Sequence, residues 1–584
     1  MKFSDVLAGL VLCLSFSLLP GFAGAEQKAG SGVTDAMLRD PAPEDWLMWR
    51  RTWNNWGYSP LQQVDRANVN QLALVWARPL SEGLQEGTPL VFDGVMYMPN
   101  PLDIVQAIRA DSGDLIWQYQ RDLPEDLKIP FPSINRNMAI YGNLIIDTSA
   151  DDYVFALDRG TGRLVWQTAI LDYRKDPSQE SSGPIIVNGK VISGRGCEPR
   201  GTPEACVITA HDARTGRELW RTSTIEKPKG KDDSWGGMPW DKRVHVGTWM
   251  VPSYDPELNL LYFGTSVTAP APKFLLAGND RHYLYHNSTL AVDADSGRIV
   301  WHYQHLVDHW DLDHTFERLL VDTEVAPDKD AVTWINPAVK PGEKRRVVTG
   351  IPGKPGVVTT LDRKTGEFLW ARPTIYQNVL KDIDVRTGKA TVNPDALFHK
   401  TGDEKLICPG GDGGKNWPAG SYSPLTGAMY MPLQNTCSRY TVNAGSKDID
   451  SVYGFIQHRM IAPGTDQVGT IYAVSVETGK LLWKYQQRAG TTSTLATGGG
   501  LIFSGDVSGH FRALDQASGK VLWDVNLGSQ VTGYPVTYSV AGRQYVAVST
   551  GSSWSTNGIA GLTPELAGGT SNMLFVFALP QSRK

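Results

Sequence analysis

An eleven-residue pattern recurs seven times along the chain and constrains its fold more than any other feature. Each copy has an apolar run, a turn centred on Ser-Gly or Thr-Gly, and a second apolar run closed by tryptophan. The copies end at Trp117, Trp166, Trp220, Trp301, Trp370, Trp483 and Trp523. Two apolar runs around a short glycine turn are typical of a β-hairpin, and glycine supplies the positive φ that the turn needs. The repeat therefore predicts a succession of small antiparallel sheets.

The number and spacing of the copies predict an all-β, eight-bladed propeller. Successive tryptophans lie between 40 (Trp483 to Trp523) and 113 (Trp370 to Trp483) residues apart, so the longer intervals carry insertions. "SYSPLTGAMYM" (421–431), inside the longest interval, is interpreted as a degenerate eighth copy. "LALVWARPL" (72–80) and "NMLFVFALP" (572–580) are expected to share one blade and close the ring without an exposed sheet edge. Each repeat tryptophan is expected to pack between neighbouring blades.

The N-terminus has the layout of a secretory signal peptide. An apolar run (6–19) follows Lys2 and leads to Ala23-Gly24-Ala25, with cleavage expected before Glu26. A membrane anchor is the alternative, but the run is short for a bilayer and no other segment is apolar for long enough. We therefore expect residues 1–25 to be removed, residues 26–584 to form a single propeller domain in the periplasm, and the mature chain to have no membrane span.

Charge and cysteine content narrow the class of protein further. A formal net charge of −5 on 584 residues, without a long basic run, makes nucleic acid an unfavoured partner. Four cysteines follow the signal peptide, and an even number in an exported chain suggests disulfides. Their order allows two pairs, Cys197 with Cys206 and Cys408 with Cys437. Zinc is the rival interpretation, but no pair has Cys-x-x-Cys spacing, and no Cys-x-x-Cys-His motif for haem occurs.

"VDHWDLDH" (307–314) is the densest group of ionisable residues outside the repeat, with three aspartates and two histidines around Trp310. It begins shortly after Trp301, where loops of a propeller converge on its axis. For Asp308, His309 and His314 the alternative to a chemical role is a solvated or supporting one, which we favour for Asp308 and His309. Asp311 is the candidate for chemistry.

The Asp-x-x-Thr/Ser-Gly-x-x-x-Trp repeat resembles the tryptophan-docking motif of the quinoprotein alcohol dehydrogenases, which bind pyrroloquinoline quinone (PQQ) on an eight-bladed propeller. The resemblance covers essentially the whole mature chain. By position, it implies that Asp311 is the catalytic base, that Glu198 in "GRGCEPRG" binds the metal, and that Lys354 in "GIPGKPG" hydrogen-bonds the reactive quinone oxygen. It further implies that Trp249 forms the aromatic floor beneath the quinone, and that the quinone carboxylates and edge contact Glu86, Arg136 and Asn416.

Two departures from the family pattern concern the cofactor pocket. Many alcohol-oxidising members have two adjacent cysteines over the quinone, where this chain has Pro130-Phe131. The metal-ligating Asn of the methanol-type enzymes is replaced in "FGTSVTAP", which leaves Ser266 and Thr268 as candidates for the third ligand. Both departures, Lys354 and the pattern "CPGGDGGKNWP...PLQNTC" (408–437) give the chain its resemblance to the branch that contains sorbose/sorbosone, polyol and secondary-alcohol dehydrogenases.

These resemblances imply a complete oxidation chemistry. Asp311 would accept the hydroxyl proton while the quinone takes a hydride from the same carbon. Glu198 and Asp311 would hold Ca²⁺ beside the quinone. Asp313 stands where lanthanide-using members add a carboxylate, so a lanthanide is the alternative metal. The substrate is expected to be a small alcohol or polyol and the electron acceptor a soluble cytochrome c; a homodimer is an open alternative.

A non-catalytic propeller that acts as a binding or outer-membrane assembly scaffold is the rival class of function. Such scaffolds share the repeat but have no reason to retain the seven site residues together. The loops that decide the substrate are not foldable from sequence. Trp554 and His510 are candidates for the entrance of the pocket, although each is equally a candidate for packing.

Overall fold

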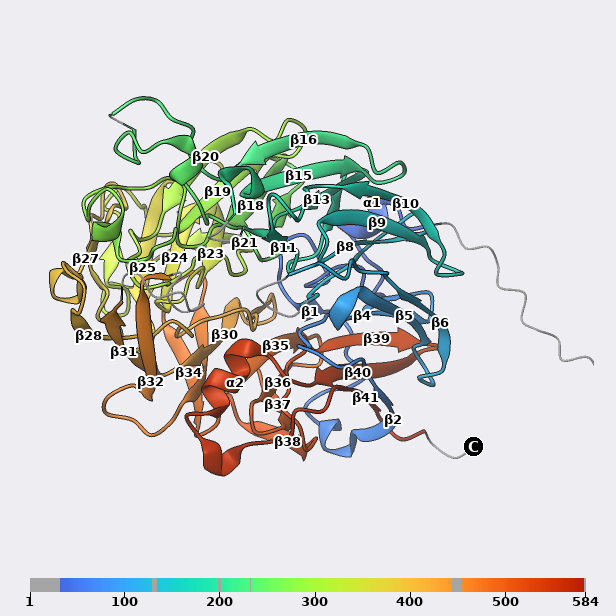
Figure 1. The fold of residues 1–584 in the computed structure, drawn as a ribbon. Coiled ribbons are helices and arrows are strands. Elements are labelled where there is room, and N and C mark those ends of the chain that lie inside the picture. Colours follow the sequence, from blue (N-terminus) through green and yellow to red (C-terminus); the bar gives the residue numbers. More distant parts are fainter. Residues whose placement is uncertain (1–31, 129–133, 198–200, 232, 444–452, 582–584) are drawn as a thin grey trace, which may run out of the picture. The chain divides into compact units, whose positions relative to one another are not determined.

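The computed structural model describes residues 32–128, 134–197, 201–231, 233–443 and 453–581. Their secondary structure is mostly β, as the repeat predicts (Figure 1). The signal peptide, Pro130-Phe131 and Glu198 lie outside the described residues. The two α-helices of the described part are α1 (Asp35–Arg39) and α2 (Trp554–Ala560). Short 3₁₀ helices are η1 (Val69–Gln71), η2 (Pro101–Asp103), η3 (Pro203–Ala205), η4 (Trp240–Lys242), η5 (Lys273–Leu275), η6 (Pro394–Ala396) and η8 (Pro564–Leu566).

Eight sheets of four or five strands lie within the described ranges, and apart from the parallel pair β1–β35 their neighbouring strands are antiparallel. Four of them come from the first half of the chain. They are β3 (Leu90–Phe92), β4 (Val95–Asn100), β5 (Ile104–Arg109) and β6 (Leu115–Gln120); β7 (Ala139–Tyr141), β8 (Leu144–Thr148), β9 (Tyr153–Asp158) and β10 (Leu164–Ala169); β12 (Ile185–Val187), β13 (Lys190–Ser193), β15 (Val207–Asp212) and β16 (Glu218–Ser223); and β17 (Ser253–Asp255), β18 (Leu260–Gly264), β19 (Ser288–Asp293) and β20 (Ile299–Gln304).

The other four use the second half together with two N-terminal strands. They are β21 (Leu319–Val325), β23 (Glu343–Gly350), β24 (Val357–Asp362), β25 (Phe368–Pro373) and β22 (Trp334–Ile335); β29 (Ser421–Ser423), β30 (Ala428–Gln434), β33 (Gly469–Ser475) and β34 (Leu481–Gln487); β1 (Tyr58–Ser59), β35 (Thr491–Thr497), β36 (Leu501–Asp506), β37 (His510–Asp515) and β38 (Val521–Asn526); and β2 (Ala73–Pro79), β41 (Met573–Ala578), β40 (Arg543–Thr550) and β39 (Val536–Val540).

The repeat forms the hairpin between the last two strands of seven of these sheets. In the copy that ends at Trp166, the carboxylate of Asp158 accepts hydrogen bonds from the backbone N–H of Thr161 at 2.9 Å and from its hydroxyl at 2.7 Å, which closes the turn. Gly162 follows with φ +70°. The Asp and Ser/Thr of the motif therefore build the turn, and its glycine supplies the left-handed residue.

Six of the seven repeat tryptophans pack on the turn glycine of the next sheet, whereas the Trp523 ring lies edge-on to Phe577 of β41. A Cβ built on Gly366 would meet the Trp301 ring at 2.7 Å, and Trp76, which has the same place in β2, meets Gly113 in the same way. The Trp117 indole N–H donates to the Arg159 carbonyl at 3.0 Å. An indole ring thus joins one sheet to the next, and it covers a turn glycine at which a β-carbon would have no room.

The eighth sheet differs from the one that the sequence suggests. "SYSPLTGAMYM" forms β29 and β30 and belongs to the same sheet as the Trp483 copy, so its interpretation as a separate eighth copy is wrong. Its Thr-Gly turn resembles the repeat because Gly427 also needs a positive φ, of 62°. The eighth sheet is instead β2–β41–β40–β39, and the register of β2 on β41 confirms that segments 72–80 and 572–580 pair.

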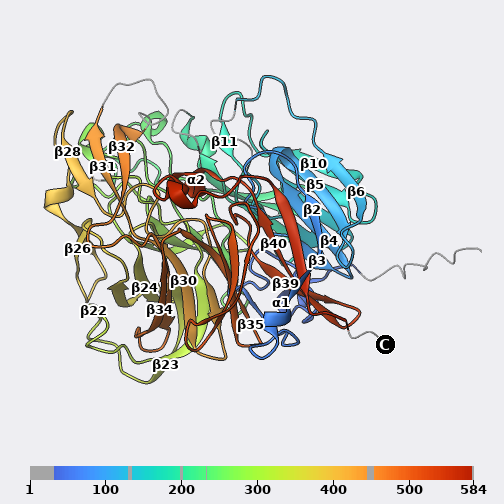
Figure 2. The ribbon, with the colours of Figure 1, turned by 90° about the horizontal axis from the view of Figure 1, so that it is seen from below.

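The longest interval is filled by additional small sheets. These are β26 (Leu380–Ile383) with β27 (Ala390–Val392), and β28 (Glu404–Ile407) with β31 (Thr436–Val442) and β32 (Phe455–Ile461); β11 (Ser178–Gln179) and β14 (Gly196–Cys197) form a further pair earlier in the chain. Figure 2 shows β31, β32, α2 and β11 on the same side of the larger sheets. Of these elements, β14, β32 and α2 contribute residues to the cavity described below.

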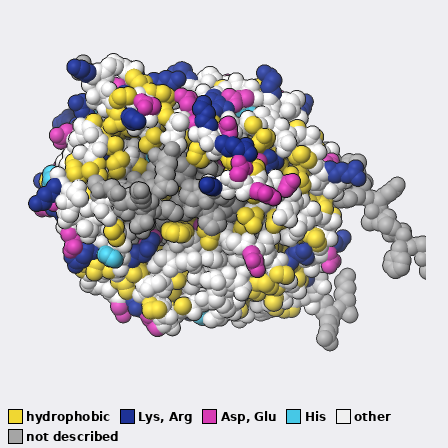
Figure 3. Space-filling view, viewed as in Figure 1, with side chains coloured by type: hydrophobic (Ala, Val, Ile, Leu, Met, Phe, Trp, Pro, Cys, Tyr) yellow, Lys and Arg dark blue, Asp and Glu magenta, His cyan; other side chains and the backbone are white. Residues whose placement is uncertain are grey.

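Both predicted disulfides form. Cys197 bonds Cys206, and Cys408 bonds Cys437, which ties the loop after β28 to β31. Among the described residues, no helix has the length and apolar character that crossing a bilayer requires. Over the face seen in Figure 3, lysine and arginine side chains are interspersed with aspartate and glutamate.

Candidate active site

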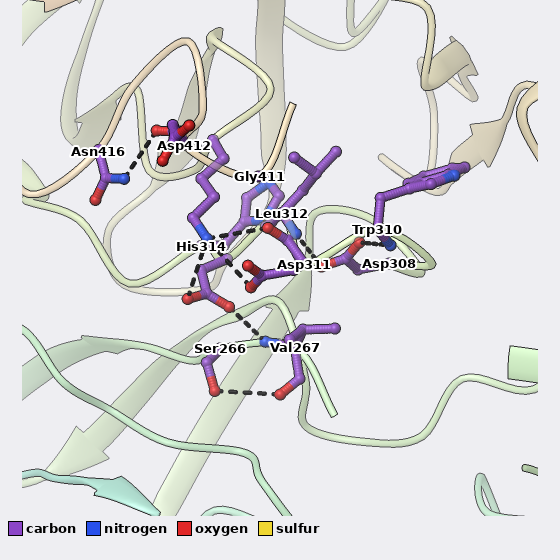
Figure 4. Close-up of polar contacts among 12 residues, drawn as sticks. Ser266, Val267, Asp308, Trp310, Asp311, Leu312, His314, Gly411, Asp412 and Asn416 are labelled. Atoms are coloured by element: carbon purple, nitrogen blue, oxygen red, sulfur yellow. Dashed lines mark hydrogen bonds and ion pairs between the residues drawn. The ribbon is translucent and has the colours of Figure 1, made fainter. Parts of the chain in front are cut away.

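The segment "VDHWDLDH" folds as a buried loop that presents Asp311. The Asp308 carboxylate accepts hydrogen bonds from the backbone N–H groups of Trp310 at 2.7 Å and of Leu312 at 2.5 Å (Figure 4). Trp310 is fully buried, and its indole N–H donates to the Ala396 carbonyl at 2.9 Å. Between these anchors, Asp311 has a φ of 63°, in the left-handed region. Asp308 is fully buried, so it is not a solvated side chain. Its carboxylate supports the backbone on both sides of Asp311.

Lys354 lies against Asp311, a contact that the motifs did not predict. Its ammonium donates to the Asp311 carboxylate at 3.1 Å and to the Asp311 backbone carbonyl at 3.0 Å. Burial raises the pKa of Asp311 well above its ordinary value, Lys354 opposes that shift, and Asp313 adds to it. Burial also disfavours the charged ammonium, but the Asp311 and Asp313 carboxylates outweigh it and raise the pKa of Lys354. The neighbouring carboxylates therefore favour the charged form of Lys354 beside the candidate base.

Trp249 and Asp313 are joined directly. The Trp249 indole N–H donates to Asp313 Oδ2 at 3.0 Å, and the Val267 backbone N–H donates to Asp313 Oδ1 at 2.8 Å. Lys354 Nζ lies 3.7 Å from Asp313 Oδ2. Both carboxylate oxygens of Asp313 thus accept hydrogen bonds from the protein, and the carboxylate fixes the indole plane relative to Lys354.

Glu86 and Arg136 form a buried ion pair at 2.6 Å. The Arg136 guanidinium lies 5.1 Å from the centre of the Trp249 ring, which links the pair to the predicted aromatic floor. Asn416 lies farther along the wall, where its amide N–H donates to the Asp412 carbonyl at 2.8 Å and its carbonyl oxygen accepts from Trp417 N–H at 2.8 Å. The sequence-predicted residues of the described part therefore converge.

These side chains line one cavity of about 200 Å³. Glu86, Arg136, Trp249, Asp311, Asp313, Lys354 and Asn416 all face it, and Cys197 of the first disulfide and Ser266 join them. Glu198 lies outside the described residues. Trp554 also lines the cavity, as expected for a residue at its entrance, whereas His510 is not among the lining residues and pairs with Asp524 at 2.7 Å.

Sequence reasoning missed several lining residues. His245 faces the cavity four residues before Trp249 in "VHVGTW", a nearness in sequence that could have revealed it; its Nδ1 is 2.6 Å from the Cys197 carbonyl. Asp412 stands in the same glycine-rich loop as Asn416. Arg459 and Gln457 lie on β32, and no sequence pattern marks them.

The cavity suits a flat anionic quinone. Trp249 offers a partly exposed ring, and Arg136 and Lys354 are buried cations that match carboxylates or a polarised carbonyl. Among the described residues, the buried Nε of Arg136 has no hydrogen-bond partner, so a donor remains for a ligand. The donors for a metal are all oxygens, from Asp311 and Ser266, which fits a hard cation. The described residues, which do not include Glu198, contain no cluster of three or more His, Cys, Asp or Glu side chains that would hold a metal.

Comparison with known proteins gives the family. Residues 46–372 and 487–546 match the PQQ family described as glucose/ethanol/alcohol dehydrogenase, beta-propeller domain. The chain belongs to the PQQ-dependent alcohol dehydrogenases. It is 31% identical to the dehydrogenase subunit of the quinone alcohol dehydrogenase of Komagataeibacter europaeus, over 94% of this chain and 77% of that protein. It is 32% identical to the quinohemoprotein alcohol dehydrogenase ADH-IIG of Pseudomonas putida, over 93% of this chain and 77% of that one.

A solved structure agrees with this assignment. The europium-containing methanol dehydrogenase superimposes with a TM-score of 0.82 at 26% identity, over 93% of this chain and 99% of that one. As a quinoprotein alcohol dehydrogenase, the chain is an oxidoreductase that acts on CH–OH donors. The PQQ-dependent alcohol dehydrogenase family thus accounts for the repeat and for the converging cavity residues together.

Proposed function

We propose that this PQQ-dependent alcohol dehydrogenase oxidises a secondary alcohol, polyol or sugar to the carbonyl compound with PQQ and a metal, and passes electrons to a soluble cytochrome c. The observation that carries the proposal is the buried Asp311–Lys354 pair beside Trp249 in one cavity. A carboxylate, a cation and an aromatic face are the parts that a quinone oxidation of an alcohol needs from the protein. The departures at Pro130-Phe131 and in "FGTSVTAP" support the polyol branch.

Each cavity residue of this chain would have a separate role in the proposed oxidation. When bound, PQQ supplies the two-electron oxidation by accepting a hydride. Asp311 accepts the hydroxyl proton of the substrate as the general base. Lys354 holds the Asp311 carboxylate in place and donates a hydrogen bond that stabilises developing negative charge in the buried site. Arg136, held by its ion pair with Glu86, and Asn416 would bind the anionic edge of the cofactor, and Trp249 would offer its ring as the stacking surface.

Ca²⁺ is the metal that we propose, held by Asp311 and Glu198, with Ser266 as a further oxygen donor. Held by these residues, Ca²⁺ would supply Lewis-acid chemistry beside Asp311. Because burial raises the pKa of Asp311, a nearby cation also keeps that carboxylate ionised, and a protonated aspartate is no base. A lanthanide would draw on Asp313, but both oxygens of that carboxylate accept protein hydrogen bonds. This engagement favours Ca²⁺.

The proposal extends to the architecture and the compartment. The eight sheets would be the blades of one propeller, joined in sequence by docked tryptophans and closed by β2 on β41. The N-terminal signal layout of residues 1–25 and the two disulfides support export to the periplasm, where disulfides form. A soluble cytochrome c in the same compartment would then be the electron acceptor. Two copies of the chain as a homodimer remain compatible with this proposal.

Reconstitution tests the function. Purified protein with PQQ, Ca²⁺, phenazine methosulfate and a dye acceptor should reduce the dye with at least one alcohol of a panel of secondary alcohols and polyols. Chelation of the metal should abolish the rate, and renewed Ca²⁺ should restore it. If PQQ does not bind and no substrate reduces the dye, the catalytic proposal is wrong and a binding scaffold becomes the better explanation.

A further inference from the structure

A second polar cluster lies in the wall of the cavity and takes no part in the proposed chemistry. Asp412, on the loop after β28, forms an ion pair with Arg459 of β32. Gln457 lies two residues before Arg459, on the same face of that strand, and its side-chain oxygen accepts a hydrogen bond from the Gly411 backbone N–H at 3.3 Å. We call Asp412, Gln457 and Arg459 the outer polar cluster; all three line the cavity.

The outer polar cluster lies one loop away from Asp311. The Gly414 backbone N–H donates to the Lys354 carbonyl at 2.8 Å, so the loop that carries Asp412 rests on the lysine that pairs with Asp311. The Tyr440 hydroxyl donates to the Trp310 carbonyl at 3.1 Å, and after burial the carboxylates of Asp311 and Asp412 are the main causes that raise the pKa of this tyrosine. Figure 4 shows Asp412 and Asn416 on the loop beside Asp311. Asp311 and the cluster therefore line one cavity from two loops that both contact Lys354.

The charges of the cluster select a neutral, hydrogen-bonding ligand. Asp412 is 7% exposed, and its negative charge is balanced by Arg459, so the pair offers no net charge to an ionic substrate. A hydroxyl group both donates and accepts, and can therefore bridge a carboxylate and a guanidinium, while the amide of Gln457 offers both functions again. Tyr453 and Trp554 also line this cavity, and their aromatic rings can contact C–H groups of a ligand.

We propose that Asp412, Gln457 and Arg459 form a subsite that binds a second hydroxyl group of a neutral polyhydroxy substrate, a polyol or a sugar, while another hydroxyl is oxidised at Asp311. The inference rests on the proposed function, because it needs the reacting hydroxyl to be held at Asp311. It adds a reason for the substrate class that lies in three residues that have no role in the proposed oxidation itself.

A substrate series of constant carbon number tests the subsite. We would measure kcat/KM of the PQQ- and Ca²⁺-loaded enzyme for butan-2-ol, butane-2,3-diol and erythritol. The wild-type value should rise with the number of hydroxyl groups. In Arg459→Leu and in Asp412→Asn, the ratio of kcat/KM for erythritol to that for butan-2-ol should fall about ten- to a hundredfold, mainly through KM, because a charge-assisted hydrogen bond is lost.

Arg439→Leu is the matched control. Arg439 belongs to β31 of the same sheet, forms an ion pair with Glu404 at 2.8 Å, and is not among the residues that line the cavity. This variant should keep the wild-type ratio. If Arg459→Leu also keeps it, or if butan-2-ol is the best substrate of the wild type, the subsite does not exist.

A binding measurement separates failure of the subsite from failure of the proposed function. Erythritol should raise the Tm of the wild type and of Arg439→Leu above the rise given by an equal concentration of butan-2-ol, and Arg459→Leu should lose this difference. If the wild type reduces no dye but erythritol still raises its Tm more than butan-2-ol does, the proposed function is refuted and the subsite is retained. If the wild type oxidises alcohols but both compounds raise its Tm equally, only the subsite is refuted.

Discussion

Asp311 faces the cavity because its neighbours hold its backbone in an uncommon conformation. A φ of 63° is costly for most residues but tolerable for aspartate, and the two hydrogen bonds from the Trp310 and Leu312 backbone to Asp308 maintain it. The Lys354 ammonium then donates hydrogen bonds to both the side-chain carboxylate and the backbone carbonyl of Asp311. The base is thus positioned from two sides before any substrate binds.

Removing the base should abolish turnover without unfolding the protein. Asp311→Ala is expected to lower kcat by a factor on the order of 10² to 10⁴, the usual contribution of general base catalysis. PQQ titration by absorbance should still show binding, since Trp249 and Arg136 remain. Asp330→Ala, an exposed aspartate of a distant loop, serves as the control and should keep the wild-type rate. A wild-type rate in Asp311→Ala would show that another residue accepts the proton.

Asp313 is predicted to orient Trp249 and Lys354 rather than to select the metal. Asp313→Ala removes the acceptor of the Trp249 indole N–H and of the Val267 N–H. PQQ affinity, measured by quenching of tryptophan fluorescence, should therefore fall about tenfold or more. Rates with Ca²⁺ and with La³⁺ should decrease together. A variant that loses only the La³⁺-dependent rate would identify Asp313 as a lanthanide ligand instead.

The site residues that could be predicted from the sequence are those that belong to short motifs near a repeat. Asp311, Lys354 and Trp249 each stand at a fixed position relative to a repeat, and the structure brings all three to one cavity. Arg459 pairs with Asp412 across 47 residues, between a strand and a loop of an insertion, and the pairing depends on the fold of that insertion. No local pattern could have predicted that contact.

At the scale of elements, the β-hairpins are the part of the fold that the sequence predicts best, because their turns have a recognisable pattern. In five of the seven copies the Asp carboxylate accepts hydrogen bonds from the Ser or Thr of the turn, so the sequence reveals these hairpins without knowledge of the packing. The same chemistry misled the interpretation of "SYSPLTGAMYM", because Gly427 makes a turn between β29 and β30 and not between the last two strands of a sheet. Turn residues define a hairpin but not its place in the sheet.

A β-carbon on a docking glycine should destabilise the fold more than one on an ordinary turn glycine. Gly366 and Gly342 have φ values of 75° and 85°, but a Cβ at Gly366 would meet the Trp301 ring at 2.7 Å, whereas Gly342 has nothing within 4 Å. Gly342→Ala should cost roughly 1–2 kcal/mol of backbone strain. Gly366→Ala should add about 1–3 kcal/mol of overpacking.

Thermal unfolding distinguishes the two glycine variants. The Tm should fall in the order wild type, Gly342→Ala, Gly366→Ala when all three are measured at one scan rate. Equal Tm values for the two variants would mean that the tryptophan ring yields without cost, and that its contact with the glycine does not stabilise the junction between sheets.

At the scale of the whole described chain, one sheet joins the two ends. β2 comes from the N-terminal part and β41 from the C-terminal part, and they pair from Ala73 with Ala578 to Pro79 with Met573. Two apolar segments near the ends, each too isolated to form a sheet alone, made this pairing predictable. What could not be predicted is that Trp76 of β2 then takes the place of a repeat tryptophan against Gly113.

Closure by this last strand should be essential for stability. A chain that ends after Asn572 lacks β41, which would leave β2 and β40 without their shared neighbour and remove the buried side chains of Leu574, Val576 and Phe577 from the core. Burial of three such side chains is worth roughly 1.5–3 kcal/mol each, so the loss approaches the total stability of a typical domain. A chain that ends after Pro580 keeps β41 and is the matched control. Soluble yield and Tm should match the full chain for the control and collapse for the shorter chain; a stable shorter chain would show that the sheets hold together without closure between the two ends.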